Sequence, residues 1–153
     1  MSFVKMKRNY FKHSKNGFTL IELLVVISIM GVLLGLSLFS FQGSKRSGRD
    51  ARRKSDLELI RSGLEVYKSD CGSYPTSLGE SLLGDDSNSS CLLTNTYISE
   101  VPSDPQGLER IYVYSSDGIT YELCAALEGI TGSETCGGSS NCGEGCNYKV
   151  TNP

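Results

Sequence analysis

A chain of 153 residues with a net charge of −2 suggests a single domain, but its charges are unevenly distributed along the sequence. Residues 1–17 carry five bases and no acid, residues 45–54 carry six bases against Asp50, and the chain from Ser55 onward carries four bases and fifteen acids. This acidic body is poorly suited to hold a nucleic acid backbone, so we expect no nucleic acid to bind there. A basic front before an acidic body is typical of a membrane-associated or processed N-terminus.

The first predicted element is the apolar run at residues 18–41, whose 24 residues contain one charged side chain, Glu22. As a helix it would be about 36 Å long, enough to cross a hydrocarbon core of about 30 Å. A cleaved secretory signal has a shorter apolar region, and a plain signal anchor fits the length. Neither a secretory signal nor a plain anchor explains Glu22, since a carboxylate inside a membrane helix costs about 2.5–3.5 kcal/mol. The alternative is that Glu22, near one end of the helix, simply reaches the lipid headgroups.

The residues GFTLIE, Gly17–Glu22, follow a short basic leader and precede an unbroken apolar run. In this they resemble the N-terminus of type IV prepilins and type II secretion pseudopilins. The resemblance implies cleavage of the Gly17–Phe18 bond by a membrane prepilin peptidase, removal of the leader 1–17 and N-methylation of Phe18. It also implies that Glu22 pairs with the α-amino group of Phe18 on a neighbouring subunit. Such pairing explains the carboxylate, because each charge offsets the cost of the other in a low dielectric.

The apolar segment departs from the family by lacking the proline that many members carry about two-thirds along it. Local melting of the helix would then rely on Gly31 and Gly35, which also form a G-x-x-x-G pair that allows close helix approach. Equally, the two glycines could have no special role, because small residues are common in membrane helices. The basic residues on the two sides of the run, five before and six after, leave the orientation undecided. The cysteines and the resemblance place the N-terminus in the cytoplasm and the body outside the inner membrane.

After the apolar run the pattern predicts an amphipathic continuation of the helix over 42–70. Apolar residues recur at intervals of 3, 4 and 3 positions: Leu57, Ile60, Leu64 and Tyr67. Gly72 and Pro75 follow as stop signals. We therefore expect one helix from about Phe18 to Ser69. The basic segment 45–54 within it has three interpretations, namely anionic lipid headgroups, acidic surfaces of neighbouring subunits, or a solvated helix face.

The remaining chain, 71–153, is predicted to form a globular head. Residues 76–109 read as a long loop with a short helix at Leu78–Leu83. Strands near Arg110–Ser115 and Ile119–Ala126 flank Asp117-Gly118, which is a strong hairpin signal. Ile119, Tyr121 and Leu123 share one face of the second strand and are expected to pack against the helix. A last edge strand is expected near Cys146–Val150. The fold class is therefore α+β, a long N-terminal helix packed against a small antiparallel sheet.

Six cysteines lie beyond the apolar run: Cys71, Cys91, Cys124, Cys136, Cys142 and Cys146. An even number on one side of a membrane segment favours disulfides in an oxidising compartment. Zinc is the alternative, but the spacing contains no C-x-x-C pair, and the single histidine, His13, lies in the leader. We expect a disulfide-stapled C-terminal region whose pairing the sequence leaves open among 15 possibilities.

The pattern GSYP…VPSDPQG…YVYSSDGITYEL resembles in particular the major pseudopilins of type II secretion and related small pilins. Some of those bind calcium in the loop between helix and sheet. Acidic loop residues that offer oxygen ligands are Asp85, Asp86, Asp104 and Glu109, although solvated carboxylates are the ordinary alternative. We assign no cofactor and no metal site.

The sequence contains no nucleophile–base pair, metal cluster or phosphate loop that would indicate an enzyme. The predicted function is a structural subunit that assembles with copies of itself into a helical filament. Its partners would be the prepilin peptidase/methylase, an inner-membrane assembly platform, other pilin subunits and membrane lipid. A surface pilus, a secretion pseudopilus and a DNA-uptake pseudopilus all fit, so the filament would be extracellular or periplasmic. The alternative is a membrane-anchored, disulfide-stapled binding domain that never polymerises.

Overall fold

The structure is a computed structural model that describes residues 17–153. The leader before Gly17, including His13, lies outside the described residues, as do the side chains of residues 38–40. Contacts between residues divide the chain into two compact units, Met1–Ser40 and Phe41–Pro153. Each unit is considered by itself below.

One helix, α1, runs from Leu20 to Cys71 over 52 residues, so the predicted long helix is present with both ends shifted by two residues. It ends at Gly72, which has φ +85° and donates its N–H to the carbonyl of Lys68 at 2.9 Å. Glycine adopts this left-handed conformation without strain and so terminates the helix. The predicted stop signal is therefore the one that the structure uses.

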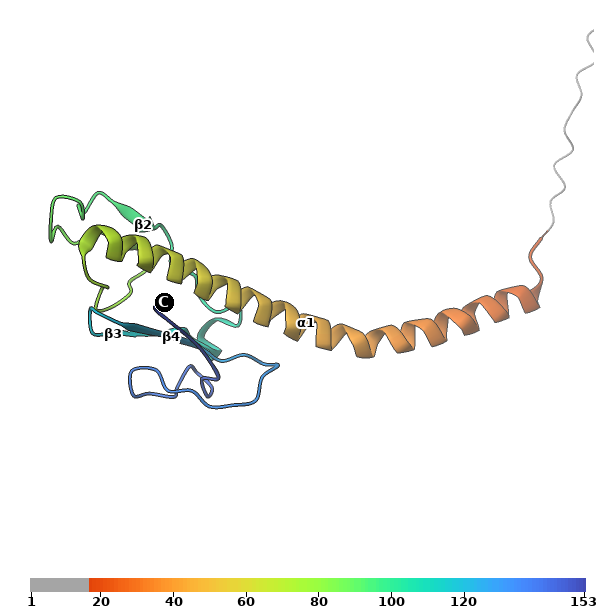
Figure 1. Cartoon of the computed structure of the whole chain (residues 1–153). Coiled ribbons are helices and arrows are strands. Elements are labelled where there is room, and N and C mark those ends of the chain that lie inside the picture. The colour runs from red at the N-terminus through yellow and green to blue at the C-terminus, as the bar shows by residue number, and fades with distance from the viewer. Residues whose placement is uncertain (1–16) are drawn as a thin grey trace, which may run out of the picture. The chain divides into compact units, whose positions relative to one another are not determined.

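The main sheet has three antiparallel strands in the order β3 (Val113–Ser116), β4 (Tyr121–Ala125) and β5 (Tyr148–Thr151). Figure 1 shows β3 and β4 beside the C-terminal part of α1. The β3–β4 pair is the hairpin that Asp117-Gly118 indicated, with Val113 opposite Cys124 and Ser116 opposite Tyr121. Residues 110–112 precede β3 rather than belonging to it. The last strand, β5, is the expected edge strand; it begins two residues later and ends one residue later than predicted.

The core lies between α1 and this sheet. The four predicted helix positions are 0–3% exposed and join one apolar cluster with β4 and β5: Leu57, Ile60, Leu64, Tyr67, Tyr121, Leu123, Ala125 and Val150. Ile119 was expected on the same face, and this prediction is wrong. It lies in the turn before β4 and is 74% exposed, because the strand alternation begins only at Tyr121. The predicted α+β class is confirmed.

The predicted short helix at Leu78–Leu83 is wrong. Leu82–Leu83 instead form strand β1, which pairs antiparallel with β2 (Thr96–Ile98), and residues 78–81 are not helical. Leu82 is 4% exposed and Ile98 is 5% exposed, and both join the core beside α1. Burial of these two side chains determines the local structure. The helical pattern of residues 78–83 is weak, because Gly79 lies within it and Gly84 follows it, so tertiary packing decides the outcome. A short 3₁₀ helix, η1 (Gly107–Glu109), follows before β3.

Candidate functional site

The N-terminal turn of α1 holds Glu22 in a reciprocal capping arrangement with Thr19. The backbone N–H and the hydroxyl of Thr19 donate to Glu22 Oε2 at 3.2 and 3.1 Å, and the N–H of Glu22 donates to Thr19 Oγ1 at 3.3 Å. This is the T-x-x-E capping box, which satisfies N–H groups that have no partner within the helix. The carboxylate therefore lies at the positive end of the helix dipole, four residues after Phe18.

The rest of this first unit is apolar and exposed. Phe18 is 88% exposed, and every described side chain from Leu20 to Ser37 is exposed. Ser28 and Ser37 bond to carbonyls one turn earlier, at 2.8 and 2.9 Å, so their hydroxyls are satisfied within the helix. By length and composition α1 is the one helix among the described residues that could cross a membrane.

A second cluster of charges lies in the other unit, around a buried arginine. The Arg53 side chain is 0% exposed and donates to both oxygens of Asp104, at 2.7 and 3.0 Å. It also donates to Asp50 at 2.8 Å and to Glu128 at 2.9 Å. Arg49 makes a two-pronged bond to the same Glu128, at 2.6 and 2.5 Å. We call these five residues the Arg53 cluster; it joins α1 to two segments far along the chain.

The surroundings of the Arg53 cluster explain its ionisation. Hydrogen bonds from Arg49, reinforced by Arg53, lower the pKa of Glu128 from 4.5 to about 2, against the effect of burial. Burial alone would lower the pKa of Arg53, but its bonds to Asp104, Glu128 and Asp50 raise it above the usual value. Burial likewise opposes ionisation of Asp50, yet N–H bonds from Glu128 and Gly129 lower its pKa. Asp50, Arg53 and Glu128 are therefore charged at neutral pH.

The six cysteines form three disulfides, Cys71–Cys91, Cys124–Cys136 and Cys142–Cys146, and no cysteine among the described residues is free. The first bond fastens the end of α1 to the loop before β2. The other two fasten the Gly/Ser-rich tail, where Cys124, Cys136, Cys142 and Cys146 form a small buried cluster with Ala126. The head is therefore stapled at both sides of its sheet, in keeping with the predicted fold class.

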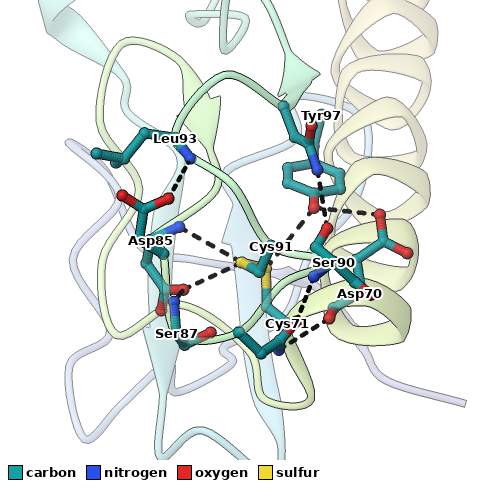
Figure 2. Close-up of a disulfide and its surroundings, with 11 residues drawn as sticks. Asp70, Cys71, Asp85, Ser87, Ser90, Cys91, Leu93 and Tyr97 are labelled. Atoms are coloured by element: carbon teal, nitrogen blue, oxygen red, sulfur yellow. Dashed lines mark hydrogen bonds between the residues drawn. A yellow bond between two sulfur atoms is a disulfide. The ribbon is translucent and has the colours of Figure 1, made fainter.

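The surroundings of the first disulfide are polar (Figure 2). Asp85 lies 3.0 Å from the sulfur of Cys91 and accepts the N–H of Ser87 at 2.9 Å. The Ser87 bonds hold the pKa of Asp85 below its usual value. On the helix side, the hydroxyl of Tyr97 donates to Asp70 at 3.2 Å. Both sides of the disulfide are thus anchored by hydrogen bonds.

Comparison with known proteins gives matches over nearly the whole chain. The prokaryotic N-terminal methylation motif matches residues 12–38, and the family described as type II secretion system (T2SS), protein G, matches residues 41–141. The type II secretion system core protein G of Escherichia coli (strain K12) is 32% identical over 117 residues, 73% of this chain and 81% of that protein. That of Pseudomonas aeruginosa is 30% identical over 135 residues, 85% of this chain and 92% of that protein. No solved structure gives a significant match.

The chain belongs to the type II secretion system protein G family. Of the filament types that the sequence left open, this family selects the secretion pseudopilus. A pseudopilin is a structural subunit, so the prediction that this chain is not an enzyme is confirmed. The methylation motif at its N-terminus includes Gly17, Phe18 and Glu22.

The acidic residues considered for calcium do not come together in this pseudopilin. Asp104 is bound to Arg53, Asp86 accepts the N–H of Leu93 at 2.8 Å, and Asp85 lies at the disulfide. Among the described residues, the only group of three potential ligand side chains is Cys71, Asp85 and Cys91. Both of its sulfurs are already bonded to each other. Asp85, Asp86, Asp104 and Glu109 therefore do not form one group of side-chain ligands among the described residues.

Sequence reasoning missed two features of the pseudopilin. None of the three interpretations of the basic segment anticipated that Arg49 and Arg53 bind carboxylates of the same subunit. Only Asp50 is a local partner, three positions before Arg53; Asp104 and Glu128 are 51 to 79 positions away from the arginines, so no local pattern could have identified them. The capping role of Thr19 was also missed, although T-x-x-E before an apolar run is a recognisable signal.

Proposed function

We propose that this pseudopilin is cleaved after Gly17 and then polymerises through its N-terminal helix into a type II secretion pseudopilus. Hydrolysis of the Gly17–Phe18 bond by prepilin peptidase leaves an α-ammonium group on Phe18, which is then N-methylated. Glu22 of one subunit pairs with that group on its neighbour. This pairing fixes the stagger between successive subunits.

The position of the Glu22 carboxylate carries this proposal. It lies in the first turn of α1, four residues after Phe18, where only Thr19 bonds to it among the described residues. Cleavage would create a positive charge at the same helix end. In a bilayer an unpaired carboxylate and an unpaired ammonium are both costly, and bringing them together offsets both penalties. In a filament each subunit has a neighbour, so association of subunits pairs the Glu22 carboxylates with the Phe18 ammonium groups.

The proposal includes a location and a set of partners. Before assembly the subunit is a single-pass inner-membrane protein with its N-terminus in the cytoplasm and residues 42–153 in the periplasm. After assembly it belongs to a periplasmic filament made of copies of itself. The subunit is processed by the prepilin peptidase/methylase. It then contacts the inner-membrane assembly platform and other pseudopilin subunits. The three disulfides support a periplasmic head, since disulfides persist in oxidising compartments.

Substitution Glu22→Ala in the native host tests the proposal. We expect the mature chain to begin at N-methylated Phe18 in both wild type and variant, measured as intact mass of the membrane-extracted protein. We expect the variant to be lost from the filament fraction, measured by shearing, sedimentation and immunoblotting. The matched control is Glu58→Ala, which removes an exposed carboxylate of α1 that lies 3.7 Å from Arg61. The control should assemble as wild type does.

A chain that still begins at Met1 would contradict the processing step. A Glu22→Ala variant that assembles as well as the Glu58→Ala control would contradict the pairing. A correctly processed wild-type chain that never enters a filament would favour the alternative, a membrane-anchored domain that does not polymerise.

A further inference from the structure

The six bases of the segment 45–54 divide into two groups. Arg49 and Arg53 belong to the Arg53 cluster and are neutralised within the subunit. The other four point outward: Lys45, Arg46, Arg52 and Lys54. Arg52 has one weak partner, Asp56 at 3.9 Å, and its side chain is 66% exposed. Lys45, Arg46 and Lys54 have no carboxylate within 4.0 Å in the described part of the chain.

Two of these outward cations line a groove of about 470 Å³ between α1 and residues 127–130. Arg46 and Lys54 come from the helix, and the opposite wall is formed by Leu127, Gly129 and the 41% exposed Ile130. Two carboxylates also line the groove, Asp50 and Glu128. Both are held by Arg53, and Glu128 by Arg49 as well. The groove thus presents two cations and an apolar side chain without a free carboxylate.

The groove begins directly after the apolar run. Gly43, in its lining, is two residues beyond Phe41. At about 1.5 Å of rise per residue, Arg46 lies roughly 7.5 Å beyond Phe41 along the helix. The headgroup layer on each side of a bilayer is about 5–8 Å thick, the difference between the hydrocarbon core and the full membrane. The ammonium of Lys45 folds back to 4.6 Å from the ring of Phe41, which keeps it at the same level.

We propose that Arg46, at the end of this groove nearest the apolar run, and Lys45 beside it bind the headgroups of anionic phospholipids in the membrane that α1 crosses. Guanidinium and ammonium groups bind phosphate through charge-assisted hydrogen bonds. Lys54 is 13 residues beyond Phe41, about 20 Å along the helix, and its ammonium lies 5.6 Å from the ring centre of Tyr148, so it is not part of this site. The inference rests on the proposed function, because it requires α1 to span the membrane. The inference goes beyond the proposed function, because it gives the unassembled subunit a lipid contact that must be broken when the subunit enters the filament.

The test uses the full chain reconstituted in phosphatidylcholine bilayers with trace spin-labelled phosphatidylglycerol or phosphatidylcholine. Electron paramagnetic resonance then gives the association of each lipid with the protein. We expect wild type to prefer phosphatidylglycerol, and Arg46→Gln to lower that preference by about fivefold, the factor for roughly 1 kcal/mol per base at an anionic surface. Lys54→Gln, in the same groove but about 20 Å beyond Phe41 along the helix, should lower it much less. The matched control is Arg61→Gln, a base of α1 that is 34% exposed and lies farther along the helix, which should leave it unchanged.

Equal lipid preference in Arg46→Gln and Arg61→Gln would overturn the proposal. An Arg46→Gln variant that keeps the preference but no longer assembles would also overturn it, and would assign the base to an acidic surface of a neighbouring subunit. Failure of the proposed function is distinguishable, because Glu22→Ala should lose assembly while keeping its preference for phosphatidylglycerol.

Discussion

Arg53 is the residue with the most partners in the subunit. Its guanidinium is fully buried and binds carboxylates from α1, from the loop before η1 and from the segment after β4. It also donates to Gln106 at 2.6 Å, so all three nitrogens have a bonded oxygen. Without Arg53, the carboxylates of Asp50, Asp104 and Glu128 would face one another with Arg49 as the one remaining cation of the cluster.

We therefore predict that Arg53→Met destabilises the head by about 3–5 kcal/mol, the usual cost of removing one partner from a buried ion pair. The measurement is urea unfolding of the full chain in detergent micelles, followed by circular dichroism. Arg52→Met is the control, because Arg52 is one position away, 66% exposed and 3.9 Å from Asp56. Its effect should stay within about 0.5 kcal/mol. Similar losses in the two variants would mean that the cluster does not hold the head together.

At the scale of elements, the β1–β2 ribbon depends on a close approach at Gly84. This glycine follows β1 and donates its N–H to the carbonyl of Asn95 at 3.0 Å. A Cβ atom there would lie 2.1 Å from the carbonyl oxygen of Leu92. The contact is with backbone, so no side chain can move aside to relieve it. The disulfide Cys71–Cys91 fixes the preceding residue of the opposing segment and limits its movement further.

Gly84→Ala should therefore destabilise the head by about 1–3 kcal/mol, as overpacking of a close contact does. Urea unfolding measures this loss of global stability. Hydrogen exchange measures the local effect and should show faster exchange confined to the amides of β2 and of the loop before it. Gly79→Ala is the control in the same loop, since its nearest atom beyond the chain neighbours would be 3.6 Å from the new Cβ. A Gly84→Ala variant as stable as Gly79→Ala would contradict the close approach.

How far the sequence predicts these elements depends on the range of the interactions that form them. The buried stripe of α1 and the β3–β4 hairpin were predictable, because helix periodicity and the Asp117-Gly118 turn act over a few residues. Ile119 was assigned to the wrong environment, because the first residue of the strand depends on where the turn ends. The pair β1–β2 was not predictable, since Leu82 is buried by Ile98 and α1 rather than by its neighbours.

The same limit applies to the sites. Gly17, Phe18 and Glu22 lie within one short motif, so the sequence alone could predict them, and the N-terminal methylation motif matches the segment that contains them. The Arg53 cluster and the three cysteine pairings join residues by tertiary structure, and the sequence offered no signal that selects them. Arg46, with Lys45 beside it, became a candidate lipid site only once the structure had separated the outward bases from Arg49 and Arg53.

At the scale of the whole molecule, two sets of ionisable groups limit the pH range in which the head is stable. Burial raises the pKa of Tyr74 to about 12, and a bond to Glu65 adds to the effect. Burial raises that of Tyr67 to about 12 as well. A group whose pKa is raised by folding contributes stability that is present below its unfolded value, here 10.0, and lost as pH rises through the folded value. The tyrosines therefore set the alkaline limit.

The acid limit comes from the Arg53 cluster. Glu128 has its pKa lowered from 4.5 to about 2, so its contribution is present above the unfolded value and disappears as pH falls toward the folded one. We predict that the melting temperature of the full chain in detergent micelles, followed by circular dichroism, is flat near neutral pH and falls across that acid interval. Glu128→Gln should melt lower at neutral pH but with a shallower acid decline, because it has lost the titrating group. An acid decline equally steep in both proteins would show that carboxylates other than Glu128 set the limit, since protonation of Glu128 would then contribute nothing to it.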